Sequence, residues 1–142
     1  TTGVDPVSRK EFWEMLKRLK QEGITIIVST PYMDEATMCD RIALIQTGKI
    51  LSIETPENIV GSYADTLYAV KADHMFSLLK ALSAFDNTIN SYAYGEYAHA
   101  SFGDNTGELE VKRVLLDKGL TNIEMHRTEP TIEDCFIKLL KK

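Results

Sequence analysis

The side chains that could do chemistry gather within residues 24–53, where an apolar run ends in Ser29 and Thr30. Their hydroxyls are candidate nucleophiles, but no histidine lies nearby in the sequence to activate them. We therefore expect Ser29 and Thr30 to cap the start of a helix. Asp34 and Glu35 follow as a candidate acid–base pair. Neighbouring positions on a helix point about 100° apart, so we expect no reactive centre shared by the two carboxylates.

The cysteines and histidines form no pattern typical of a metal site. His74, His99 and His126 have no spacing with one another, or with either cysteine, that metal ligation requires. Cys39 and Cys135 lie far apart, each among apolar residues at helical spacing, which favours two buried free thiols over a disulfide or a ligand pair. We assign no metal ligand.

Tyr92, Tyr94 and Tyr97 surround a turn signal at Gly95-Glu96 and could stack on a ligand. The tyrosine-rich segments on either side, residues 89–94 and 97–102, predict a hairpin. Tyrosines on the half-buried face of a sheet are the commoner arrangement, and we favour it.

Composition argues against nucleic-acid binding and against a membrane-spanning segment. The 142 residues are 44% hydrophobic and 26% charged, which is typical of one or two small soluble domains. A net charge of -5 with scattered basic residues argues against binding to nucleic acid. No apolar run approaches the roughly 18 residues that span a bilayer, so we expect any membrane association to come through a partner.

The first part of the chain is predicted to be an α/β unit. Asp5 and Pro6 are typical of a helix N-terminus, and Gly23 is expected to end that helix. Apolar residues three and four apart predict its inward face: Phe12, Met15, Leu16 and Leu19. Residues 24–28 form a continuous β-branched run, typical of a strand covered on both faces of a mostly parallel sheet.

Turn and cap signals predict the next elements. Thr47-Gly48 lies between two apolar segments and predicts an antiparallel hairpin. Thr55-Pro56 then predicts a short helix that ends at Gly61.

A new alternation of elements begins near Thr66, after a linker at residues 62–65. Four strands and two helices are predicted in the order β-α-β-β-α-β, which favours a ferredoxin-like sandwich with two helices on one face of an antiparallel sheet. Thr131 with Asp134 is a capping-box pattern, and it predicts a final amphipathic helix.

Several segments occur in the order and spacing found in the ATP-binding subunits of ABC transporters. They are TTGVDP (residues 1–6), ITIIVST (24–30), YMDEA (32–36), DRIALIQTGKIL (40–51) and TPENI (55–59). EPTIEDCF at residues 129–136 resembles the tail of the drug- and polysaccharide-exporter branch. The resemblance implies the C-terminal part of a P-loop ATPase core over residues 1–62, followed by a small ferredoxin-like α+β domain with a closing helix over residues 66–142.

The resemblance also implies roles for three residues. Gly3 and Asp5 match the D-loop, whose aspartate works across an ATP-bound dimer near the partner's nucleotide. Pro31 stands where the family has its switch histidine, which faces the γ-phosphate. Proline has neither a side-chain donor nor a backbone N–H, so we expect slow or no hydrolysis at a site that contains Pro31.

No phosphate-binding G-x-x-x-x-G-K-[ST] motif occurs in the 142 residues. We therefore expect a C-terminal fragment that lacks the Walker A, signature and Walker B segments and does not catalyse. The resemblance implies that its parent uses ATP and Mg²⁺ to drive export, with a membrane-spanning subunit and a second ATP-binding domain at the inner face of the membrane. The alternative is a non-enzymatic regulatory or dimerisation module that binds a small ligand on the C-terminal sheet.

Overall fold

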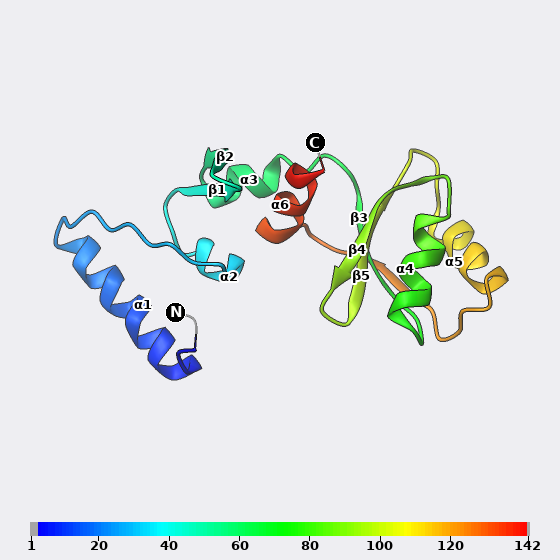
Figure 1. Ribbon diagram of the computed structural model, residues 1–142, viewed down its shortest axis with the longest axis horizontal. Coiled ribbons are helices and arrows are strands. Elements are labelled where there is room, and N and C mark those ends of the chain that lie inside the picture. Colours follow the sequence, from blue (N-terminus) through cyan, green and yellow to red (C-terminus); the bar gives the residue numbers. More distant parts are fainter. Residues whose placement is uncertain (1–2, 142) are drawn as a thin grey trace.

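The computed structural model describes residues 3–141, which form a mixed α/β chain with two antiparallel sheets (Figure 1). The helices are α1 (Pro6–Gln21), α2 (Met33–Ala36), α3 (Pro56–Gly61), α4 (Met75–Ser83), α5 (Glu108–Asp117) and α6 (Ile132–Leu140). The strands are β1 (Ile42–Gln46), β2 (Lys49–Glu54), β3 (Leu67–Lys71), β4 (Thr88–Tyr94), β5 (Tyr97–Phe102) and β6 (Glu124–Arg127).

Helix α1 begins and ends where its cap signals predict. Asp5 is the N-cap, and Gly23 takes up a left-handed conformation just beyond the helix, with φ of 85°. The predicted inward face is partly wrong, because Trp13 is the buried residue while Phe12 and Met15 are 37% and 41% exposed. Figure 1 shows the reason: α1 stands apart from both sheets, so few elements cover it.

The predicted strand at residues 24–28 is wrong. These residues form an extended connection without strand pairing, and Ile27 is 94% exposed. A strand is stable only when its backbone groups pair with a neighbour. Among residues 3–141 the strands form only the β1–β2 hairpin and the four-stranded sheet, and neither includes this segment.

The next helix begins later than Thr30 and Pro31 predict. Tyr32 is the N-cap of α2, and its side chain makes no capping hydrogen bond. Thr30 Oγ1 instead accepts a hydrogen bond from Tyr32 N at 3.1 Å, which forms a local turn before the helix. Ser29 and Thr30 therefore do not cap α2, and Asp34 and Glu35 lie in its first turn.

The hairpin prediction is confirmed. β1 pairs with β2 through a turn in which Thr47 and Gly48 both have positive φ, 47° and 74°. That combination gives the mirror-image turn that suits the twist of a two-residue hairpin. Thr55 caps α3, as the sequence predicts.

The four-stranded sheet has the order β4-β5-β3-β6, with every neighbouring pair antiparallel. The predicted order β-α-β-β-α-β is confirmed from β3 to β6. α4 and α5 lie on the same side of the sheet in Figure 1 and share one core with it. Its fully buried members include Val70, Leu78 and Leu82.

The final helix α6 begins at the predicted capping box, in which Thr131 and Asp134 bond to each other's backbone N–H. Its buried face does not join the core under α4 and α5. Ile132 and Cys135 pack instead with Ile59 of α3 and Ile42 of β1, and Figure 1 shows α6 beside α3. The end of the chain therefore returns to its first part.

Candidate functional site

The predicted D-loop residues lie at the exposed start of α1. Thr1 and Thr2 fall outside the described residues, and Gly3 has a left-handed φ of 77°. Asp5 Oδ1 accepts hydrogen bonds from Val7 N at 3.1 Å and Ser8 N at 3.0 Å. Hydrogen bonding from Ser8 holds the pKa of Asp5 below its ordinary value. Asp5 thus caps the helix as a carboxylate.

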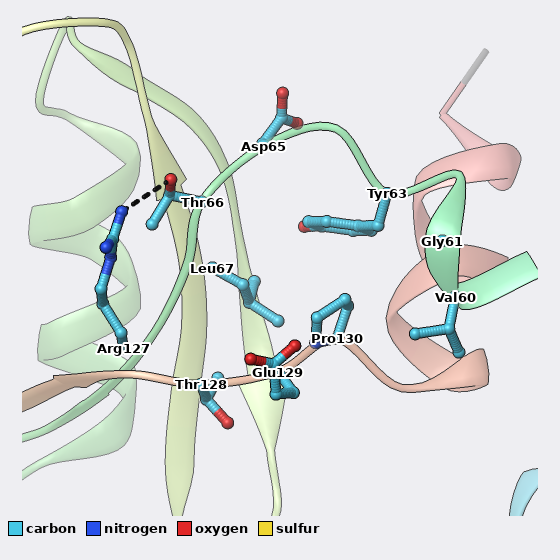
Figure 2. A pocket seen from close by; sticks show the side chains of 10 residues that line it. All are labelled: Val60, Gly61, Tyr63, Asp65, Thr66, Leu67, Arg127, Thr128, Glu129 and Pro130. Carbon is cyan, nitrogen blue, oxygen red and sulfur yellow. Dashed lines mark hydrogen bonds between the residues drawn. The ribbon is translucent and has the colours of Figure 1, made fainter. Parts of the chain in front are cut away.

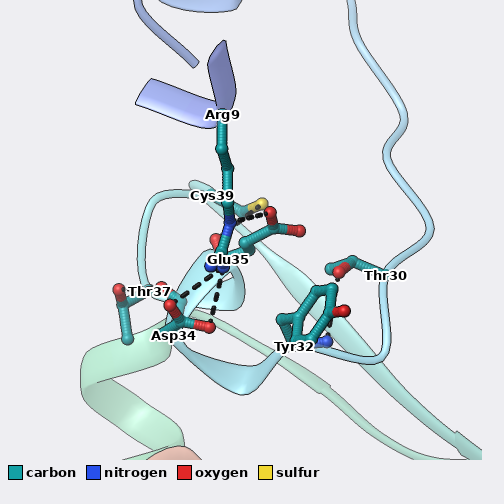
Figure 3. A network of polar contacts seen from close by, with 7 residues as sticks. All are labelled: Arg9, Thr30, Tyr32, Asp34, Glu35, Thr37 and Cys39. Atoms are coloured by element: carbon teal, nitrogen blue, oxygen red, sulfur yellow. Dashed lines mark hydrogen bonds and ion pairs between the residues drawn. The ribbon is translucent and has the colours of Figure 1, made fainter. Parts of the chain in front are cut away.

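Pro31 lies on the surface at the end of the extended connection, directly before Tyr32 and α2. The segment that follows it is held by one residue from α1. Arg9 Nε lies 2.6 Å from Glu35 Oε1, and Arg9 Nη2 lies 2.9 and 3.0 Å from the two carboxylate oxygens of Asp34 (Figure 3). The guanidinium also lies over the Tyr32 ring, 4.9 Å from its centroid.

The two carboxylates that contact Arg9 differ in their exposure to solvent. The Glu35 side chain is fully buried, whereas that of Asp34 is 71% exposed. The hydrogen bond with Glu35 is the main cause that raises the pKa of Arg9. The two carboxylates bind one guanidinium, because that group offers separate N–H donors to each.

A second polar cluster joins α6 to the face of the sheet away from α4 and α5. Asp134 Oδ1 lies 2.6 Å from His99 Nδ1 and accepts a hydrogen bond from Tyr92 Oη at 2.6 Å. Tyr94 stacks on the His99 ring with centroids 4.0 Å apart, and its hydroxyl lies 3.3 Å from Thr131 Oγ1. Tyr92 and Tyr94 therefore belong to a half-buried sheet face, the arrangement that we favoured from the sequence.

The charges in this cluster follow from its contacts. Burial by itself would raise the pKa of Asp134, but hydrogen bonds from His99, Tyr92 and Thr131 outweigh it and hold that pKa below its usual value. Burial is also the first cause that raises the pKa of Tyr92, and the bond to Asp134 adds to it. The cluster is a hydrogen-bonded carboxylate to which the neutral Tyr92 hydroxyl donates.

A groove of about 470 Å³ lies where the linker after α3 passes the connection from β6 to α6 (Figure 2). Arg127 Nη2 donates to Thr66 Oγ1 at 3.3 Å at one side of this groove. Tyr63, Leu67 and Pro130 supply apolar lining. The groove therefore has both polar and apolar lining, and it lies beside the end of α3, the start of β3 and the end of β6.

The chain matches no profile of a known protein family. It is 29% identical over 145 residues to the daunorubicin resistance ATP-binding protein DrrA2 of Streptomyces coeruleorubidus, covering 98% of this chain and 45% of that protein. It is 31% identical over 142 residues to the Nod factor export ATP-binding protein I of Burkholderia lata, covering 98% of this chain and 44% of that protein. A 65-residue match, 42% identical, joins it to the probable multidrug ABC transporter ATP-binding protein YbhF of Escherichia coli, covering 46% of this chain and 11% of that protein.

This chain is homologous to ABC transporter ATP-binding proteins. The predicted resemblance, including its drug- and polysaccharide-exporter branch, is confirmed. The chain spans less than half the length of each of these ABC relatives.

The next observations concern the cysteines, metal ligands and membrane-spanning helices. Both cysteines are free, with Cys135 buried and Cys39 partly so. Within residues 3–141, no three His, Cys, Asp or Glu side chains group as a metal site would require. No helix in the same range is long and apolar enough to cross a bilayer.

Sequence reasoning missed Arg9 and His99, although their partners attracted attention. Arg9 lies 25 and 26 positions from Asp34 and Glu35, and His99 lies 35 positions from Asp134. Contacts of that separation leave no periodic signal. For Arg9, its position one helical turn beyond the Asp5 cap is the one local clue.

Proposed function

We propose that this chain is the C-terminal part of the ATP-binding subunit of an ABC exporter, whose parent protein hydrolyses ATP with Mg²⁺ to drive export. The observation that carries the proposal is the similarity of 98% of the chain to export and resistance ATP-binding proteins. On this basis the parent associates with a membrane-spanning subunit at the cytoplasmic face of the membrane. The exported compound is a drug-like or Nod-factor-like molecule, by analogy with the names of the relatives.

The chain divides into two functional parts on this proposal. Residues 1–62 belong to the ATP-binding core, and residues 66–142 form an accessory ferredoxin-like domain. The order β4-β5-β3-β6, with α4 and α5 on one face, supports the ferredoxin-like assignment. The closing helix α6 packs on α3, so it ties the accessory domain to the core.

Gly3 and Asp5 serve as D-loop residues that face a second ATP-binding domain. The exposure of both residues at the start of α1 supports this role, because a contact across a dimer requires an accessible side chain. The cap uses Oδ1 of Asp5, and a carboxylate has further acceptor sites. Capping and dimer contact are therefore compatible.

Pro31 makes the site that contains it a poor catalyst. A histidine at this position would offer an imidazole donor, and proline offers none. Removal of one positioned transition-state donor costs about 10²- to 10³-fold in rate. A second, intact site in the dimer would then carry the turnover.

Substitution of Pro31 in the intact parent tests this function. With the second site of the dimer inactivated, Pro31→His should raise ATP turnover by about tenfold or more, and Pro31→Ala should not, because it removes the ring without adding a donor. Equal turnover of the wild-type protein and both variants would contradict the assignment. Absence of ATP hydrolysis in every variant, including one with a restored histidine, would contradict the proposed activity itself.

The isolated chain should neither bind nor hydrolyse ATP, because its sequence has no phosphate-binding glycine loop. Calorimetry with Mg-ATP checks this expectation. Micromolar binding by these 142 residues would contradict it.

The groove beside Thr66 and Arg127 favours a second candidate, a regulatory or dimerisation module that binds a small ligand next to the C-terminal sheet. A ligand screen monitored by thermal shift, with Arg127→Ala as the control, separates the two. Size-exclusion mass measurement detects self-association of the chain. Dimerisation alone would favour neither candidate, because an ABC core that lacks its other half also exposes apolar surface.

A further inference from the structure

Two surface segments meet at Arg9, although they are separated by more than twenty residues. One is the first turn of α1, which starts at the Asp5 cap, and the other is α2 with the turn that contains Pro31. Residues 24–30 connect them without helix or strand. The relative placement of the two segments therefore depends on side-chain contacts.

We propose that Arg9 is a positioning residue that holds the D-loop end of α1 against the Pro31 segment, so that the two move as one unit during ATP hydrolysis. This inference rests on the proposed function. Arg9 itself contacts no nucleotide in this proposal. It acts through Tyr32, Asp34 and Glu35, which lie in the segment that directly follows Pro31.

The contact needs the shape of arginine. Nε faces Glu35 at 2.6 Å while Nη2 faces Asp34 at 2.9 Å, and the planar group lies over the Tyr32 ring. A lysine ammonium has the same charge, but it is a compact group. It cannot contact two carboxylates and stack on an aromatic ring at the same time. Arg9 is one helical turn beyond Asp5, and Arg9 N donates to Asp5 O at 3.0 Å. Arg9 therefore belongs to the helical turn that Asp5 caps.

A second ion pair provides a built-in comparison. Lys20 at the other end of α1 lies 2.5 Å from Asp40, but the two side chains are 58% and 73% exposed. Solvent-exposed pairs of this kind contribute little to stability. Arg9 is 26% exposed and Glu35 is fully buried, so the contact at Arg9 is better shielded from water and stronger. Lys20→Gln is therefore the matched control for Arg9→Gln.

The first measurement is hydrogen exchange in the 142-residue chain. The amides of Met38 and Cys39 donate to Glu35 O and Ala36 O, so their protection reports on α2. We expect Arg9→Gln to speed exchange at these amides by about tenfold or more, Arg9→Lys to have an intermediate effect, and Lys20→Gln to change it by less than about twofold. Amides of β5 should keep wild-type exchange, which shows that the rest of the chain stays folded.

Trp13 gives an independent signal, because it is the chain's one tryptophan and lies buried on α1 one turn beyond Arg9. Its fluorescence should shift to longer wavelength in Arg9→Gln and not in Lys20→Gln. Unchanged exchange at Met38 and Cys39, together with unchanged Trp13 emission, would overturn the contact as a link between the segments.

The second measurement is ATP turnover by the intact parent protein. A positioning role predicts that Arg9→Gln lowers kcat by about tenfold while KM for ATP stays within about twofold. Arg9→Gln combined with Glu35→Gln should be no slower than the single variant, since both act through one contact. Faster exchange with wild-type kcat and KM would reduce Arg9 to a structural role and overturn the proposal.

The two measurements separate this inference from the proposed function. If the wild-type parent hydrolyses no ATP, the proposed function fails and the positioning role fails with it. Exchange in the 142-residue chain still decides whether Arg9 joins α1 to α2. If the parent is active but Arg9→Gln has no effect on kcat, the proposed function stands and only this inference fails.

Discussion

His99 Nδ1 lies 2.6 Å from Asp134 Oδ1, so an imidazole on the sheet meets a carboxylate in the first turn of the last helix. Both side chains are almost completely buried, with 6% and 0% exposed. Asp134 also accepts from Tyr92 and closes the capping box with Thr131. This one carboxylate therefore fixes the start of α6 and attaches it to the sheet.

Asp134→Asn should lower the free energy of unfolding at pH 7 by about 2–3 kcal/mol, the usual contribution of hydrogen bonds to a buried charged group. Guanidinium unfolding followed by circular dichroism measures the loss. Glu133 lies one residue earlier and is exposed. Glu133→Gln should change the free energy of unfolding by less than about 0.5 kcal/mol. A similar loss in both variants would show that general helix-end charge, and not the contact with His99, is responsible.

Acid should remove this contribution. The pKa of Asp134 is held below its ordinary value of 3.8 when the chain is folded. The stabilisation is then fully present above about pH 3.8 and is lost as pH falls through the folded pKa. The difference between the wild-type chain and Asp134→Asn should therefore shrink as the pH is lowered from about 4 to 2.5. A difference that stays constant over that range would contradict a charged Asp134.

Thr47→Asn should stabilise the chain. Thr47 is β-branched and has φ of 47°, a left-handed conformation that such residues rarely adopt. Asparagine tolerates this conformation, and Asn-Gly is the preferred pair in this hairpin turn. We expect a gain of about 1 kcal/mol, measured by thermal and chemical unfolding. Thr47→Val keeps the branch and should give no gain, so equal stability of both variants would contradict the reasoning.

Local signals predicted most of the elements, because each is set by a few neighbouring residues. The cap at Asp5, the turn at Thr47-Gly48 and the capping box at Thr131 all occur where the sequence predicts. The exception at residues 24–28 has a physical reason: β-branched residues favour a strand, but a ladder needs a neighbour that the described chain does not provide.

The site was predictable only in part. Pro31 was assigned by resemblance, and its place before α2 was not predicted, because the helix begins later than Thr30 and Pro31 indicate. The contact of Arg9 with Glu35 was not predictable, since it depends on how the connection folds back over 26 positions. The packing of α6 on α3 is also long-range, although the capping box predicted where that helix begins.

Cys135 should resist alkylation in the folded chain. Burial, aided by the nearby charge of Asp134, raises its pKa to about 11, and its sulfur donates to Ile59 O at 3.3 Å. Cys39 is only partly buried, so iodoacetamide at pH 8 should modify it first. Mass spectrometry of timed digests distinguishes the two thiols. In denaturant both should react at similar rates, and rapid modification of Cys135 without denaturant would contradict its burial.

Asp5 can be tested for its two roles with two substitutions. Asp5→Ala removes the acceptor for Val7 N and Ser8 N, so exchange of these amides should speed up, whereas Asp5→Asn keeps an oxygen there and should retain protection. Because folding lowers the pKa of Asp5, the charged cap is fully present above the ordinary pKa of 3.8 and is lost as the pH falls through the lower, folded pKa.

In the intact parent, a dimer contact that needs the negative charge of Asp5 predicts that Asp5→Asn lowers ATP turnover although the cap is preserved. Wild-type turnover in Asp5→Asn together with reduced turnover in Asp5→Ala would mean that capping alone accounts for Asp5.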